Sequence, residues 1–146
     1  MVLWNEITGT PTLPIRFQIP RGYCEYGKNN QYNLVYLNIE NKEFLEWFKR
    51  LEAKLVQREP LDSRVSLENG TIHVKYVDDF TQIFDEKNTF LFDMDVTMND
   101  CFVDCLVEID KVYGPMKDTG SYGITCKIFQ ARIIPNCMFT SDSTFE

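Results

Sequence analysis

The chain has 146 residues, of which 44% are hydrophobic and 25% charged, and its formal net charge is −7. That length corresponds to about one ordinary domain, and the composition is that of a folded globular protein. A disordered chain, a fibrous repeat and a disulfide-stapled miniprotein are therefore excluded. No apolar run approaches the about 18–20 residues that a membrane-spanning helix requires. We expect a single domain over residues 1–146, with a turn-rich N-terminal stretch and a short C-terminal tail.

The cysteines favour a reducing compartment. There are five, an odd number with no Cys-x-x-Cys pair. Cys101, Cys105 and Cys126 lie in apolar-rich stretches, where a free cysteine acts as a small buried hydrophobe. Residues 1–10 lack the basic start and apolar stretch of a signal peptide. We therefore expect reduced thiols and an intracellular protein.

The N-terminal part has the pattern of an extended entry followed by a strand. Three of the six prolines and two glycines fall within residues 11–27, which makes this stretch rich in turns. Two strands are predicted in this part, at Ile15–Ile19 and at Tyr32–Ile39.

One strong amphipathic helix follows, which we predict at about residues 41–58. Asn41 is a good N-cap, and Pro60 prevents the helix from continuing. Its apolar residues recur at helical period and form one stripe: Phe44, Phe48, Leu51 and Leu55. Such a stripe is typical of a helix that packs on a core.

After the helix the apolar period switches to two, as in strands. Residues 64–67 and 71–77 flank Asn69-Gly70, the strongest short hairpin signal, and residues 80–84 and 90–92 form shorter β-like runs. The longest alternations are Cys101–Tyr113 and Tyr122–Ile134, with a slip near Gln130–Ala131 that predicts a bulge. The sequence therefore predicts a mostly-β α+β domain whose strands curl into a small barrel.

The charge is unevenly distributed along the chain. Residues 77–110 contain ten acidic residues and one basic residue, whereas the rest of the chain has a net charge of +2. We interpret the acidic segment as a solvated face, on which Asp104, Glu108 and Asp110 meet water. A protein that is acidic overall does not bind polyanions indiscriminately. Its net negative charge is nevertheless compatible with a local basic groove elsewhere on the fold.

Motifs for chemistry are largely absent. The single histidine, His73, lies on a predicted strand without a nucleophile signature, and we interpret it as a surface or core residue. Residues 93–104 only faintly resemble a calcium loop, because they lack its glycine and its bidentate glutamate. Cys101 and Cys105 share a strand face but have no second ligand pair for zinc. We expect no catalytic residue, no metal site and no cofactor.

Aromatic residues are in surplus, at 14% of the chain. Most of the phenylalanines are expected in the core. Tyr113 and Tyr122, however, flank a glycine-bounded loop that lies close to Lys111, Lys117 and Lys127. Aromatic side chains interleaved with cations on a barrel groove are typical of single-stranded nucleic acid binding, since bases stack on the rings while cations follow the phosphates.

Residues 101–134 resemble the closing hairpin of the OB-fold single-stranded-DNA-binding proteins of large DNA viruses and of tailed phages. The matching pieces are Val103–Ile109, Lys111-Val112-Tyr113, Tyr122-Gly123-Ile124 and Ile128-Phe129-Gln130. Asn99-Asp100 replaces the glycine that is usual before the first strand, and residues 141–146 are a thin version of the acidic, Phe-ending tail with which relatives recruit replication proteins. The resemblance implies a small OB-like β-barrel and, for a viral protein, a location in the host cytoplasm or nucleus.

We therefore expect a non-enzymatic single-stranded DNA-binding protein that acts in DNA replication or recombination, with replication proteins as further partners and no membrane association. In this hypothesis the aromatic residues stack on bases and the basic residues contact phosphates. The nucleic-acid-binding residues are Lys111, Tyr113, Lys117, Tyr122, Lys127, Phe129 and Arg132. The alternative is a protein-interaction or structural subunit of a virion or replication complex that docks through its acidic face, and a small-molecule enzyme is a third possibility.

Overall fold

The structure is a computed structural model that describes residues 4–5, 10–11, 15–29, 33–91 and 98–136. The expected acidic tail at residues 141–146 and Cys137 lie outside these described residues. Within the described part of the chain, no helix is long and apolar enough to span a membrane.

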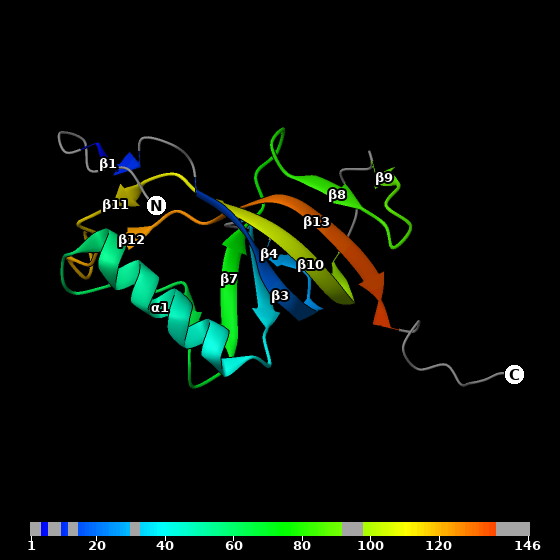
Figure 1. Cartoon of the computed structure of the whole chain (residues 1–146), viewed down its shortest axis with the longest axis horizontal. Coiled ribbons are helices and arrows are strands. Elements are labelled where there is room, and N and C mark those ends of the chain that lie inside the picture. The colour runs from blue at the N-terminus through cyan, green and yellow to red at the C-terminus, as the bar shows by residue number, and fades with distance from the viewer. Residues whose placement is uncertain (1–3, 6–9, 12–14, 30–32, 92–97, 137–146) are drawn as a thin grey trace, which may run out of the picture.

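Five strands close a small barrel (Figure 1). In chain order they are β3 (Ile15–Tyr26), β5 (Leu34–Asn38), β7 (Thr71–Lys75), β10 (Asn99–Ile109) and β13 (Lys127–Pro135). Each strand pairs with its neighbour in the order β7-β5-β3-β10-β13, and a parallel contact between Lys75 and Lys127 joins β7 to β13. If the five barrel strands are numbered 1 to 5 along the chain, their order around the closed barrel is 1-2-3-5-4. This is the order of a Greek-key barrel of the OB type. The predicted mostly-β fold with a small OB-like barrel is confirmed.

Shorter strands extend this barrel or form separate ribbons. The extensions are β4 (Lys28–Asn29), β6 (Val65–Ser66), β8 (Gln82–Phe84) and β9 (Phe90–Leu91). The ribbons are β1 (Trp4–Asn5) with β2 (Thr10–Pro11), and β11 (Val112–Tyr113) with β12 (Gly123–Ile124). The two long alternations of the sequence are therefore each divided, into β10 with β11 and into β12 with β13.

The barrel core comes from the apolar alternation of the strands. On β10 the odd-numbered residues from Cys101 to Ile109 are buried, as the period-two pattern predicts. Cys24, Cys101, Cys105 and Cys126 are buried free thiols, which agrees with the expectation of reduced core cysteines. The bulge is also confirmed: Leu106 pairs with Gln130 but Val107 pairs with Ile128, so Phe129 is the extra residue.

The helix α1 (Lys42–Val56) packs against β6 and β12 and follows the lower side of the barrel in Figure 1. Asn41 caps it, because its side chain accepts a hydrogen bond from the backbone N–H of Phe44 at 3.0 Å. Gln57, in the left-handed conformation at φ 54°, ends it. Leu45, Phe48 and Leu55 are buried, so the predicted core-packing helix is confirmed.

Candidate functional site

A groove of about 630 Å³ lies between the outer face of β5 and β7 and the connection from β10 to β13, residues 110–126. We call it the β7 groove. Because the inward residues of β5 and β7 fill the core, Tyr36, His73 and Lys75 point outward on this face. The side chains that line the groove come from four segments: Leu34, Asp62, Arg64, His73, Lys75, Val77, Asp110, Lys111, Tyr113, Met116, Ile124, Thr125, Cys126 and Lys127.

Two of the four cations at the β7 groove are not held by an ion pair within the described part of the chain. Lys75 and Lys111 are exposed, and neither forms an ion pair with a described residue. Arg64 is paired with Asp62 at 2.7 Å, and Lys127 is paired with Asp110 at 2.9 Å. The groove therefore offers two lysines to a negatively charged ligand.

At the floor of the groove a hydrogen-bonded triad fixes Arg64. Its Nη2 donates to Asp62 Oδ2 at 2.7 Å and to the Tyr113 hydroxyl at 2.6 Å, while that hydroxyl donates to the same carboxylate oxygen at 2.5 Å. Burial, and then the hydrogen bond to Asp62, raises the pKa of Tyr113, so the phenol is protonated. Gly123 makes this approach possible, since a Cβ there would lie 2.6 Å from the Tyr113 hydroxyl oxygen.

A buried carboxylate supports the triad from below. Glu52, on the core side of α1, accepts hydrogen bonds from the Ser63 hydroxyl at 2.5 Å and from the backbone N–H of Arg64 at 2.6 Å. Burial raises the pKa of Glu52. The two hydrogen bonds compensate for the cost of burying this polar group, and they fix the chain direction just before β6.

An aromatic ledge lies beside the groove on the outer face of the barrel. Tyr36 and His73 are cross-strand partners on β5 and β7, and their ring centroids are 5.2 Å apart. Tyr36 is 50% exposed, so one of its faces is open to a ligand. Burial, and then the charge of Arg64, lowers the pKa of His73 to about 4, so the imidazole is neutral near pH 7. Both rings therefore offer uncharged stacking surface.

The loop from Gly114 to Gly120 contributes Met116 to the lining of the groove. It is a tight turn in which Met116 and Ser121 pair their backbones, and Gly114 (φ 129°) and Gly120 (φ 68°) adopt conformations that favour glycine. Lys117 is exposed on this loop but is not among the residues that line the groove. The Tyr122 ring packs against the core and beneath Arg58, 5.6 Å from its guanidinium carbon, and so lies outside the groove as well.

The acidic residues of β10 do not simply meet water, which corrects the sequence-based interpretation. Asp104 pairs with Arg21 at 2.8 Å and with Arg132 at 2.7 Å. Glu108, which is buried, pairs with Arg16 at 2.7 Å and lies 3.6 Å from Lys127. The reason is that β10 is flanked on both sides by strands that carry cations at the opposing positions.

Asp110 is held in the same way. Burial alone would raise its pKa, but hydrogen bonds from Thr125 and Lys127 outweigh that effect and lower it. The hydrogen bond to Asp110 in turn raises the pKa of Lys127. Asp104, Glu108 and Asp110 are therefore each paired with a cation of the protein.

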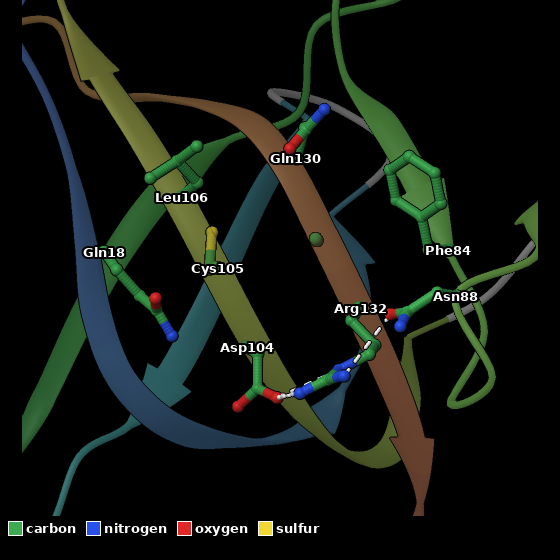
Figure 2. A pocket seen from close by; sticks show the side chains of 9 residues that line it. Gln18, Phe84, Asn88, Asp104, Cys105, Leu106, Gln130 and Arg132 are labelled. Atoms are coloured by element: carbon green, nitrogen blue, oxygen red, sulfur yellow. Dashed lines mark hydrogen bonds and ion pairs between the residues drawn. The ribbon is translucent and has the colours of Figure 1, made fainter.

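Phe129 and Arg132 lie on the outer face of β13, away from the β7 groove. The guanidinium of Arg16 covers the Phe129 ring at 3.9 Å, and Phe80 packs against the same ring. Arg132 lines a second groove of about 400 Å³ beside β8, where Figure 2 shows it reaching Asp104 and Asn88. Of the seven residues expected from the sequence, the β7 groove thus brings together Lys111, Tyr113 and Lys127.

Sequence reasoning missed Tyr36, Arg64 and Lys75 at this groove and gave His73 no binding role. The alternation in residues 34–38 and 71–75 contains a signal for three of them, since the polar or aromatic positions between buried ones face outward. No such signal exists for Arg64, which precedes β6 and meets Tyr113 only when the barrel closes. Among the described residues, no three His, Cys, Asp or Glu side chains are grouped so as to hold a metal ion.

No protein-family model and no curated protein sequence matches the chain. Among solved structures, it is similar to the crystal structure of gp2.5, a single-stranded DNA binding protein encoded by bacteriophage T7. The two share 11% sequence identity at a TM-score of 0.53, over 92% of this chain and 98% of that chain. At this low sequence identity, the comparison shows a shared fold. The protein therefore has the same OB-like barrel fold as this phage protein.

Proposed function

We propose that the protein binds single-stranded DNA in the β7 groove. The observation that carries this proposal is the position of the groove on the barrel. It lies against the second and third barrel strands, β5 and β7, and under the connection between the fourth and fifth. OB barrels bind oligonucleotides on that face and with that loop. The solved structure with the same fold is also that of a single-stranded DNA binding protein.

The side chains in and beside the groove suit the two parts of a single strand. Lys75, Lys111 and, from the loop, Lys117 contact phosphates. Tyr36 and the neutral His73 stack on bases, a contact worth about 1–3 kcal/mol per base. Because stacking on these rings requires an open base face, the groove selects unpaired strands over duplex. The net charge of −7 further disfavours indiscriminate polyanion binding.

The proposal revises the roles of the residues expected from the sequence. Lys111, Lys117 and Tyr113 remain in the interface. Lys127 and Arg132 contribute less than expected, because Asp110 and Asp104 already hold them. Tyr122 and Phe129 support the fold of the site, since each packs beneath an arginine within the protein.

This binding is non-enzymatic and serves DNA replication or recombination, the processes that expose single strands, inside the cell. Replication proteins are its further partners. The alternative, a docking subunit of a virion or replication complex, is favoured by the acids of segment 77–110 that remain exposed, such as Asp78 and Asp79. Docking through this acidic face would not require the lysines of the β7 groove.

The test is a fluorescence anisotropy titration of labelled oligo-dT at low and moderate salt, with a hairpin duplex as competitor. We expect binding that weakens with salt and resists the duplex. The salt slope is the slope of the logarithm of the binding constant against the logarithm of the salt concentration. The double variant Lys75→Gln/Lys111→Gln should flatten this slope by about 1.4, because each lost single-strand phosphate contact contributes roughly 0.7. The matched control is Lys42→Gln/Lys49→Gln on the exposed face of α1. No binding at low salt would overturn the proposal in favour of the docking subunit.

A further inference from the structure

The triad of Arg64, Asp62 and Tyr113 at the floor of the β7 groove has hydrogen-bonding capacity that the protein does not use. The Nε of Arg64 is buried without a hydrogen-bond partner, and its Nη1 makes no hydrogen bond to a described residue. Asp62 Oδ1 likewise has no hydrogen-bond partner among the described residues, and the side chain of Asp62 is 37% exposed. The paired residues therefore leave a guanidinium donor and a carboxylate acceptor without a described partner, and both residues line the groove.

The triad is held rigidly. The Arg64 side chain is only 15% exposed, and its backbone N–H is fixed by Glu52. The Tyr113 hydroxyl bridges Arg64 and Asp62, so neither side chain can turn without breaking a hydrogen bond. A fixed, planar guanidinium is suited to recognising a ligand of defined geometry, whereas a mobile cation is suited to neutralising charge.

The charge of the triad distinguishes between the two parts of a nucleotide. Arg64 and Asp62 form a neutral pair, and Glu52 lies directly beneath. A phosphate at the floor would meet the exposed carboxylate of Asp62, whose charge repels it. A nucleobase edge, by contrast, presents donors and acceptors side by side without a charge. Met116, which is 45% exposed, adds apolar surface to the groove, and such surface suits the face of a base.

We propose that Arg64 and Asp62 bind the hydrogen-bonding edge of one nucleobase inserted into the β7 groove, while the phosphates remain at the rim with Lys75 and Lys111. This inference rests on the proposed single-stranded DNA binding and names the part of the strand that the groove floor recognises. Arg64 is then a base-contacting residue, and Tyr113 is a positioning residue that holds the guanidinium.

The test compares oligo-dT with an abasic oligonucleotide of the same length, which keeps the phosphates and lacks the bases. The wild type should prefer oligo-dT. Arg64→Lys keeps the charge but loses the planar fork. It should reduce the oligo-dT affinity about tenfold, within the range for one bidentate base contact, and leave the abasic affinity and the salt slope unchanged. Arg50→Lys, on the exposed face of α1, is the matched control and should change neither affinity.

Tyr113→Phe provides a second variant, since it removes only the bridging hydroxyl. It should lower the preference for oligo-dT over the abasic strand, and thermal unfolding reports whether each variant is folded. A salt slope flattened by Arg64→Lys, equal losses on both oligonucleotides, or an unchanged preference in a folded Tyr113→Phe variant would overturn the base assignment. Equal wild-type binding of both oligonucleotides overturns it too but leaves the proposed function standing, whereas absence of binding to either defeats the function itself.

Discussion

The Nζ of Lys127 lies 2.9 Å from Oδ2 of Asp110, and Glu108 approaches the same ammonium group at 3.6 Å. Two carboxylates thus neutralise the one lysine that joins the β7 groove to the outer face of β13. Lys111, on the same connection, is exposed and forms no ion pair with the described residues. The two lysines therefore differ in the charge that they offer to a ligand.

This difference predicts unequal effects in DNA binding. Lys111→Gln should weaken oligo-dT binding and flatten the salt slope by about 0.7 units, since one phosphate contact is lost. Lys127→Gln should leave the slope nearly unchanged, because its charge is already neutralised. Anisotropy titrations across a salt series measure both slopes. A larger slope change in Lys127→Gln than in Lys111→Gln would mean that DNA displaces the Asp110 pairing.

Tyr36 should contribute stacking without charge. We expect Tyr36→Ala to weaken oligo-dT binding by about 1–3 kcal/mol at an unchanged salt slope, because stacking releases no counterions. Tyr36→Phe keeps the ring and should bind almost as the wild type does. Equal losses in the two variants would show that the hydroxyl, and not the aromatic face, makes the contact.

The buried environment of His73 predicts a pH dependence of stability. Its pKa is about 4 in the folded protein, below the ordinary value of 6.5, so the unfolded chain binds more protons between these values. The free energy of unfolding should therefore fall as the pH decreases from about 6.5 to about 4. The loss attributable to this group is on the order of 3 kcal/mol.

Urea unfolding at several pH values measures this dependence. His73→Gln should flatten it over the same range. Glu52, whose pKa is raised by burial, contributes with the opposite sign, but it does so in both proteins, so the difference between the two pH dependences reports on His73. An equally steep dependence in His73→Gln would show that another group is responsible.

Phe48 anchors α1 to the barrel. It is fully buried and contacts the rings of Phe17 and Phe44, so Phe48→Ala should cost about 3–5 kcal/mol of stability through the cavity that it leaves. Glu46→Ala, on the exposed side of the same helix, should cost about 0.5 kcal/mol or less. Urea unfolding compares the two. Small and equal effects would contradict the packing described for α1.

The elements that follow a clear apolar period could be predicted from the sequence. The stripe of α1 and the alternation of β10 depend only on local spacing. The odd-numbered residues of β10 are buried as expected, and of the helix stripe Phe48 and Leu55 are buried while Phe44 and Leu51 are partly buried against the core. The pairing of charges could not be predicted in this way. Asp104 lies opposite Arg132, and Glu108 lies opposite Lys127, only in the register that the bulge at Phe129 creates. A shift of one residue would reverse the faces, and the sequence marks the bulge only approximately.

The candidate site could likewise be predicted only where it depends on local spacing. Lys111 and Tyr113 could be selected because they lie in one cation- and aromatic-bearing segment. Tyr36, Arg64 and Lys75 come from three other segments, and they reach the groove because β7 pairs with β5 and contacts β13. Glu52 lies within the helix that was predicted, but its burial depends on Ser63 and Arg64, which lie beyond the end of α1.

The most direct test of the central claim, that single-stranded DNA binds in the β7 groove, is a map of amide chemical-shift changes when oligo-dT is added to the isotopically labelled protein. The account predicts changes concentrated at Tyr36, His73, Lys75, Lys111 and Tyr113. The amides of Gln82, Phe84 and Phe90 beside the second groove should remain unmoved. Shift changes confined to Gln18, Phe84 and Gln130, in the groove of Figure 2, would contradict it.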